Sequence, residues 1–160
     1  MFPANPEVWS TTFAPLNNMS SFIQSDKLVP LAPYVSAESK LHHHAVFGND
    51  YSAPCTWYKR GIANLGIDAE LAALDEGIIK DKLSVKTLLI TGSNDRVCLS
   101  DKAKESMNAF VKGGLKGELL KVVDLDAGHW INLERAKETN AALLEFFESD
   151  RMSGAGRSVL

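Results

Sequence analysis

The sequence predicts an α/β fold in which a helical segment precedes two parallel strand–helix units. Residues 85–91 and 119–125 are short apolar runs rich in Val, Leu and Ile, as expected of strands buried on both faces of a parallel sheet. A turn and then a segment with helical apolar spacing follow each run, so the order is strand, helix, strand, helix. Strands that alternate with helices in this way pair in parallel, because the helix provides the crossover.

Short helices separated by Pro, Ser and Asn are expected before residue 84. Asn5 followed by Pro6 has the pattern of an N-cap with proline in the first helical turn. Ser36 can cap a helix that runs through three consecutive histidines, and Pro54 can open another helix. Asp68 is expected to cap a further short helix.

The second half of the chain divides into two helices that follow the two strands. Ser100 can cap the first of them, and the last helix is expected to start near Glu134 and to bury one apolar face, which includes Leu143, Leu144 and Phe147. The predicted organisation is therefore a helical segment over 1–83, part of an α/β core over 84–149 and a flexible tail over 150–160.

The bulk composition is that of an ordinary globular protein. A chain of 160 residues, 45% of them hydrophobic, is long enough for about one domain with a sizeable core. The net charge is 17 − 20 = −3 without a run of like charges, so neither a nucleic acid nor an anionic membrane is expected as a partner. The cysteines, Cys55 and Cys98, stand far apart and outside any CxxC pattern, which favours a reducing compartment.

The sequence also predicts a cytoplasmic location. No apolar stretch approaches the roughly 20 residues of a membrane span, and the first residues lack the pattern of a signal peptide. A peroxisomal location is less favoured, because Ser158-Val159-Leu160 lacks the basic middle residue of the targeting tripeptide.

Asp95 and His129 are the candidate catalytic residues. Each lies just beyond one of the two predicted strands, and 129 − 95 = 34 residues separate them. Catalytic groups of open α/β sheets lie past the carboxyl ends of strands, and neighbouring strands about 4.8 Å apart would bring the two loops together. A carboxylate could then accept the Nδ1 proton of His129 and leave Nε2 free as a general base.

Other roles and other acids compete with this interpretation. An Asp in a Gly-Ser-Asn-Asp turn is more commonly only a turn former. Asp124 and Asp126 flank the histidine loop and could serve as the acid. Asp124 lies inside the strand and Asp126 stands only three residues from His129, so Asp95 is favoured.

Three motifs occur at distant places in the chain. Gly128-His129-Trp130 is followed by Glu134 and a helix, the segment from Tyr51 to Lys59 contains Pro54, and Pro6-Glu7-Val8-Trp9 lies near the start. Together they resemble the C-terminal half of epoxide-hydrolase-like α/β-hydrolases: the first is similar to the C-terminal signature of that family, the second to part of its helical cap, and the third to its fungal members. The resemblance extends over about residues 6–148. It implies that residues 1–83 are a cap segment and that 84–149 hold the last two βα units of a hydrolase core.

The resemblance implies a mechanism without a cofactor or a metal. A nucleophilic Asp, or Ser in esterase relatives, opens the epoxide of a small apolar substrate and forms a covalent ester with it. A water activated by the histidine then hydrolyses this ester. Asp95 matches the late acid, His129 the base, and Trp130 a residue that lines the pocket. Fungal members of this family often belong to secondary-metabolite pathways, so such a pathway is the expected context.

This sequence departs from the family pattern at two places. It contains neither Gly-x-Ser-x-Gly nor the motif that carries an Asp nucleophile, so the nucleophile and the oxyanion hole are expected upstream of residue 1. His43 occupies the slot of a catalytic cap tyrosine, as a substrate-binding candidate with Tyr51, while Tyr34 is a weaker candidate donor. An inactive hydrolase remnant or interaction partner, and a serine-esterase relative, therefore remain as alternatives.

No metal site is expected from the sequence. Adjacent histidines on a helix point about 100° apart, whereas ligands on one helix face need a spacing of four residues. Cys98 is expected to be a small buried apolar residue. Two strands alone leave both sheet edges unpaired, which predicts a homo-oligomer formed through an exposed edge.

Overall fold

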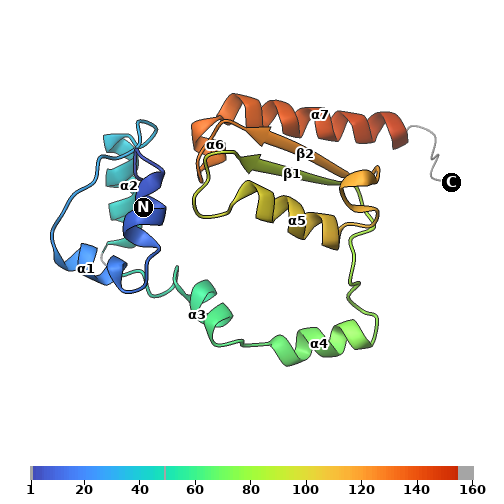
Figure 1. The fold of residues 1–160 in the computed structure, drawn as a ribbon, viewed down its shortest axis with the longest axis horizontal. Coiled ribbons are helices and arrows are strands. Elements are labelled where there is room, and N and C mark those ends of the chain that lie inside the picture. The colour runs from blue at the N-terminus through green and yellow to red at the C-terminus, as the bar shows by residue number, and fades with distance from the viewer. Residues whose placement is uncertain (1, 49, 155–160) are drawn as a thin grey trace. The chain divides into compact units, whose positions relative to one another are not determined.

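The computed structural model describes residues 2–48 and 50–154, and the chain forms two compact units. The first unit consists of Met1–Tyr34 together with Lys82–Leu160, and the second of Val35–Asp81. The N-terminal 34 residues therefore group with the strand-containing part of the chain. The second unit contains α2 (Ala37–Phe47), α3 (Thr56–Ile62) and α4 (Ile67–Asp75). The first contains η1 (Trp9–Phe13), α1 (Asn18–Gln24), β1 (Thr87–Gly92), α5 (Ser100–Phe110), η2 (Gly114–Lys116), β2 (Leu120–Leu125), α6 (Ile131–Glu134) and α7 (Ala136–Gly154) (Figure 1).

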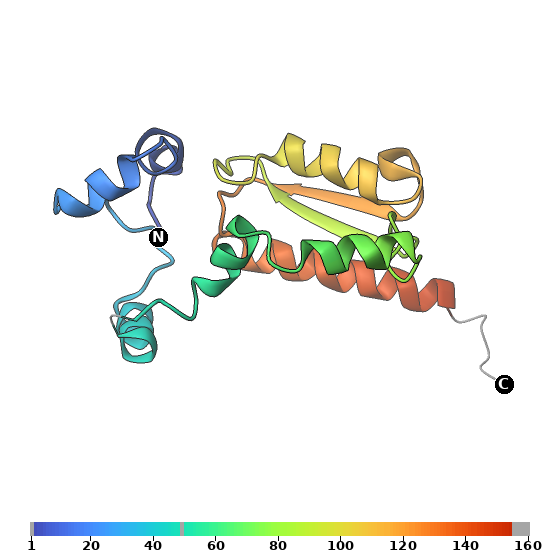
Figure 2. The ribbon, with the colours of Figure 1, turned by 90° about the horizontal axis from the view of Figure 1, so that it is seen from below.

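The centre of the first unit is a small parallel sheet. Strands β1 and β2 pair in parallel, from Thr87 opposite Leu120 to Gly92 opposite Leu125. Helix α5 contacts both strands, and α7 contacts β1 from the opposite face (Figure 2). The predicted mixture of helices with parallel strands is confirmed, since helix α5 makes the crossover between the two strands.

The core of this unit is small, so the expectation of fully buried strands and of a buried apolar face on the last helix is wrong in part. Residues 87–90 of β1 are half-buried, and only its last two residues, Thr91 and Gly92, are buried. The predicted apolar face of the last helix is also exposed in part: Leu144 is 63%, Phe147 60% and Leu143 37% exposed. The reason is that two strands offer too little surface to cover a helix of 19 residues.

Ion pairs attach both helices to β2. Lys104 of α5 binds the carboxylate of Asp124, and Lys121 of β2 lies 2.6 Å from Glu145 of α7. These pairs are partly exposed, so each contributes little by itself.

The predicted helix starts are correct in part. The Ser36 hydroxyl accepts a hydrogen bond from the Ser39 amide at 3.0 Å and so caps α2, and the Asn5 side chain accepts one from the Glu7 amide at 3.0 Å. Asp68 is not a cap. Gly66 takes that position with φ of +88°, and Asp68 lies in the first turn of α4, where a carboxylate still favours the helix dipole.

The last helix differs from its prediction at both ends. A one-turn helix, α6, comes first, and α7 begins at Ala136 rather than near Glu134. Helix α7 continues to Gly154, so the predicted tail is helical up to that residue, and 155–160 lie outside the described residues. Within the described part of the chain, no helix combines the length and apolar composition needed to cross a bilayer.

Candidate active site

The loops that follow β1 and β2 are joined by backbone hydrogen bonds. The Ser93 amide donates to the Leu125 carbonyl and the Asn94 amide to the Ala127 carbonyl, each at 2.9 Å. Gly92 lacks a side chain at the point of closest approach between the loops. The residues that follow each strand are therefore held next to one another at the carboxyl edge of the sheet.

Asp95 and His129 form a hydrogen-bonded pair in these loops. Nδ1 of His129 lies 3.0 Å from Oδ2 of Asp95, whose residue is 5% exposed. The other carboxylate oxygen of Asp95 accepts the backbone amide hydrogens of Val97 at 2.7 Å and Cys98 at 2.9 Å. Because Asp95 is fixed by its own turn, it can hold the imidazole with a proton on Nδ1, which leaves Nε2 as an acceptor.

Aromatic side chains surround the His129 ring. Trp9 makes an edge-to-face contact with it at a centroid separation of 5.9 Å, and the neighbouring Trp130 makes another at 5.3 Å. Phe2 packs on Trp130 with centroids 4.8 Å apart. The His129 side chain remains 26% exposed, so solvent or a small molecule can reach the ring through an apolar surrounding.

The other two candidate acids bind different partners. Asp124 accepts hydrogen bonds from Thr91 at 2.6 Å and Ser100 at 3.0 Å, and its carboxylate also pairs with Lys104. The hydrogen bonds from Lys104 and Thr91 lower the pKa of Asp124. Asp126 accepts a hydrogen bond from the Asn94 amide group at 2.7 Å. Of the three carboxylates, Asp95 is the one that binds His129.

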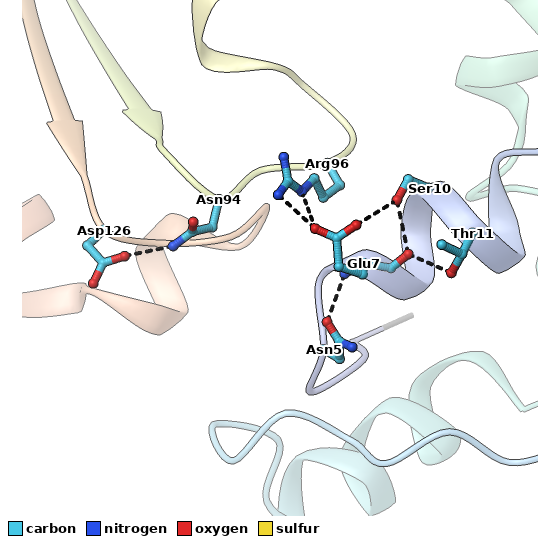
Figure 3. A network of polar contacts seen from close by, with 7 residues as sticks. All are labelled: Asn5, Glu7, Ser10, Thr11, Asn94, Arg96 and Asp126. Carbon is cyan, nitrogen blue, oxygen red and sulfur yellow. Dashed lines mark hydrogen bonds and ion pairs between the residues drawn. The ribbon is translucent and has the colours of Figure 1, made fainter.

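A polar network that includes Arg96, the residue after Asp95, ties the N-terminal segment to the loop after β1 (Figure 3). Glu7 pairs with Arg96 through contacts of 2.8 Å to Nε and 2.7 Å to Nη2, and Ser10 donates to the other Glu7 oxygen at 3.1 Å. A cavity of about 300 Å³ is lined in part by Glu7 and Arg96, whereas Asp95 and His129 do not line it. The sequence carried no signal for the Glu7–Arg96 pair, because 89 residues separate the two.

Glu134 anchors the backbone just before His129. Its carboxylate accepts the Gly128 amide hydrogen at 2.6 Å. Burial raises the pKa of Tyr34, as do the negative charge of Glu134 and a hydrogen bond to it. Tyr34 therefore serves to hold Glu134 in place, and both residues support the loop that positions His129.

The remaining predicted site residues form a separate cluster in the second unit. Nε2 of His43 lies 3.1 Å from the Tyr51 hydroxyl, and Phe47 packs against both rings. His43 and Tyr51 are exposed. The structure thus brings His43 to Tyr51 within this unit, and it brings Asp95 to His129 and Trp130 within the other.

Cys98 corrects the prediction of a small buried apolar residue. It is exposed, because the turn that follows Asp95 directs the chain to the surface before α5 begins. Its donor atom and those of Asp95 and His129 lie within 4.8 Å of one another, so these three residues could hold a metal ion. Partial desolvation of the thiol, and then the charge of Asp95, raise the pKa of Cys98. The Asp-x-x-Cys spacing was the only sign of this proximity in the sequence.

Comparisons with known proteins do not add to these observations. No protein-family model matches the chain, and no curated protein or solved structure shows significant similarity to it. The functional conclusion therefore rests on the geometry around Asp95 and His129.

Proposed function

We propose that this chain provides the acid and the histidine of a nucleophile–acid–histidine triad in an epoxide-hydrolase-like α/β-hydrolase. The observation that carries the proposal is the 3.0 Å hydrogen bond between Asp95 and His129. Both residues follow parallel strands at the same sheet edge, in the chain order of the acid and the base of such triads. In this hydrolase fold, β1 and β2 would be the last two strands of a larger parallel sheet.

Each residue has a defined role in the proposed reaction. Asp95 accepts the Nδ1 proton and stabilises the imidazolium that forms when Nε2 removes a proton from water. The resulting hydroxide attacks the covalent ester that the nucleophile has formed with the substrate. The apolar rings of Trp9 and Trp130 beside His129 favour a small apolar epoxide or ester as substrate.

Cys98 is a poor nucleophile for this reaction although it lies near His129. A cysteine attacks as the thiolate, and partial desolvation together with the charge of Asp95 raises the pKa of Cys98 and so disfavours that form. This supports an Asp, or a Ser in the esterase variant, as the triad nucleophile.

Covalent trapping on the native protein tests the proposal. The intact mass of the native protein is measured first, and an aryl epoxide and a p-nitrophenyl ester are then assayed with wild type, His129→Ala and His44→Ala. We expect turnover by the wild type and by His44→Ala, whose altered residue is exposed on α2. His129→Ala should lose turnover and, with the aryl epoxide, accumulate an ester adduct of one substrate mass, because ring opening releases no leaving group. Absence of turnover and of adduct in all three proteins would contradict the proposal.

A second candidate is an inactive relative that acts as an interaction partner. It is favoured by exposed apolar side chains in the described part of α7 and by strands that, among the described residues, pair only with each other. Native protein that turns over no substrate but co-purifies with a defined partner in constant stoichiometry would support this candidate.

A further inference from the structure

Three side chains of different chemistry converge beside the sheet edge. A carboxylate oxygen of Asp95, the sulfur of Cys98 and a ring nitrogen of His129 lie within 4.8 Å of one another. They come from two loops, since Asp95 and Cys98 share the turn after β1 and His129 follows β2. A site formed from two loops that backbone hydrogen bonds hold together is defined by the fold and does not depend on one mobile segment.

The donor set matches a particular class of cation. Thiolate sulfur and imidazole nitrogen are ligands of Zn²⁺ and similar transition ions, whereas Ca²⁺ and Mg²⁺ take oxygen ligands. In tetrahedral coordination with bonds of about 2.0–2.3 Å, the donors are about 3.3–3.7 Å apart. Nδ1 and Oδ2 are 3.0 Å apart and all three donors lie within 4.8 Å of one another, so shifts of at most about 1.5 Å reach this geometry, and the exposed Cys98 side chain can make them.

The surroundings supply the support that a metal ligand needs. Two backbone amides hold the Oδ1 atom of Asp95, which leaves Oδ2 directed toward His129. Such contacts outside the ligand shell orient a ligand before the ion binds. Cys98 is exposed and His129 is partly exposed, so an ion can enter from solvent, and three protein ligands leave a fourth position for water.

We propose that Asp95, Cys98 and His129 bind one zinc-class divalent cation through Oδ2, Sγ and Nδ1. The ion takes the place of the proton between Nδ1 and Oδ2, and the imidazole then carries its proton on Nε2. The Cys98 thiol releases its proton to the solvent as the sulfur–metal bond forms, so the charges balance. The cation also removes the repulsion between the Asp95 carboxylate and the thiolate.

The cation site and the hydrolase role use the same two residues in different states. With the ion bound, Nε2 is no longer a base, so a zinc-class ion should inhibit the proposed hydrolase. The cation site nevertheless needs no substrate and no nucleophile, so metal binding can be measured whether or not the chain belongs to a hydrolase.

Cobalt titration of the full chain tests the proposal. Co²⁺ substitutes for Zn²⁺ and gives a near-ultraviolet charge-transfer band when a thiolate binds it. The proteins compared are wild type, Cys98→Ser, His129→Gln and the control Cys55→Ser, whose cysteine is also exposed but lies in the second unit. Far-ultraviolet circular dichroism establishes that each variant keeps its fold.

We expect wild type and Cys55→Ser to bind one Co²⁺ per chain with the thiolate band, which Zn²⁺ displaces. Cys98→Ser should lose the band, and both Cys98→Ser and His129→Gln should bind about tenfold more weakly or worse. The proposal is overturned if the wild type shows no band, or if the band survives in Cys98→Ser and disappears in Cys55→Ser. Because no substrate is present, failure here leaves the trapping experiment on the hydrolase unaffected.

Discussion

A Cβ atom on Gly92 would lie 2.5 Å from the carbonyl oxygen of Gly128. Gly92 ends β1 and Gly128 directly precedes His129, so the absence of one side chain allows His129 to approach Asp95. The same Cβ would lie 2.6 Å from the carbonyl oxygen of Ala127. Neither oxygen belongs to a side chain that could rotate away, so any larger residue at position 92 must move the backbone.

Gly92→Ala should therefore destabilise the fold and separate Asp95 from His129. We expect a loss of about 1–3 kcal/mol in the free energy of unfolding, as for other overpacked positions. Urea unfolding measures the loss. Gly61→Ala is the matched control, because a Cβ at Gly61 in α3 meets nothing within 4 Å. Equal stability of the two variants would show that the loops are not packed as described.

Asp95→Asn should change which nitrogen of His129 carries the proton. The asparagine oxygen can still accept the two backbone amide hydrogens, but its amide group then faces Nδ1 as a donor. Nitrogen-15 spectra of the imidazole should show the proton on Nδ1 in wild type and on Nε2 in the variant. If the proposed hydrolase role is right, we expect turnover to fall by about 10²–10⁴-fold. Asp126→Asn is the control, and a proton that stays on Nδ1 in Asp95→Asn would argue against the pairing.

The Asp124–Lys104 pair predicts a specific pH dependence. The lowered pKa of Asp124 means that its contribution to stability is full above the unfolded value of 3.8 and is lost as pH falls through the lower, folded pKa. The Asp124 side chain is 39% exposed, so solvent screening limits the coupling to less than about 1 kcal/mol. A double-mutant cycle of Asp124→Asn and Lys104→Met at neutral pH and at about pH 2 measures this coupling. A coupling that is equally large at both pH values would contradict the assignment.

The sheet predicts concentration-dependent self-association. Within the described residues, β1 and β2 pair only with each other, so each has an edge with unpaired backbone groups. Sedimentation over a hundredfold range of concentration should show dimers or larger species at the upper end. A monomer that unfolds reversibly with a midpoint independent of concentration would exclude this behaviour.

The strands and the edge at which Asp95 meets His129 could be predicted because their signals are local. The apolar runs at 85–91 and 119–125 correspond to β1 and β2 with shifts of one or two residues at their ends. The contact between Asp95 and His129 follows from parallel pairing, which brings the ends of both strands to one edge. What those residues do there stays a prediction that the experiments above address.

Features that depend on distant or fine geometry could not be predicted. The exposure of Leu144 and Phe147 depends on how much sheet lies beneath α7, which helical spacing does not encode. The approach of Cys98 to the Asp95–His129 pair depends on the exact turn after β1. The prediction that Asp68 caps a helix is wrong, because Gly66, two residues earlier, adopts the left-handed conformation that starts α4.

The parallel arrangement of β1 and β2 also restricts the symmetry of any assembly built on the sheet. Two copies related by a two-fold axis perpendicular to the sheet can join identical edges, β1 to β1 or β2 to β2, and those contacts are necessarily antiparallel. A parallel contact must instead join β1 of one copy to β2 of the next. That contact is heterologous and leaves one edge free at each end, so it extends into an open filament unless the rotation between copies closes a ring, whereas the antiparallel contact closes a pair.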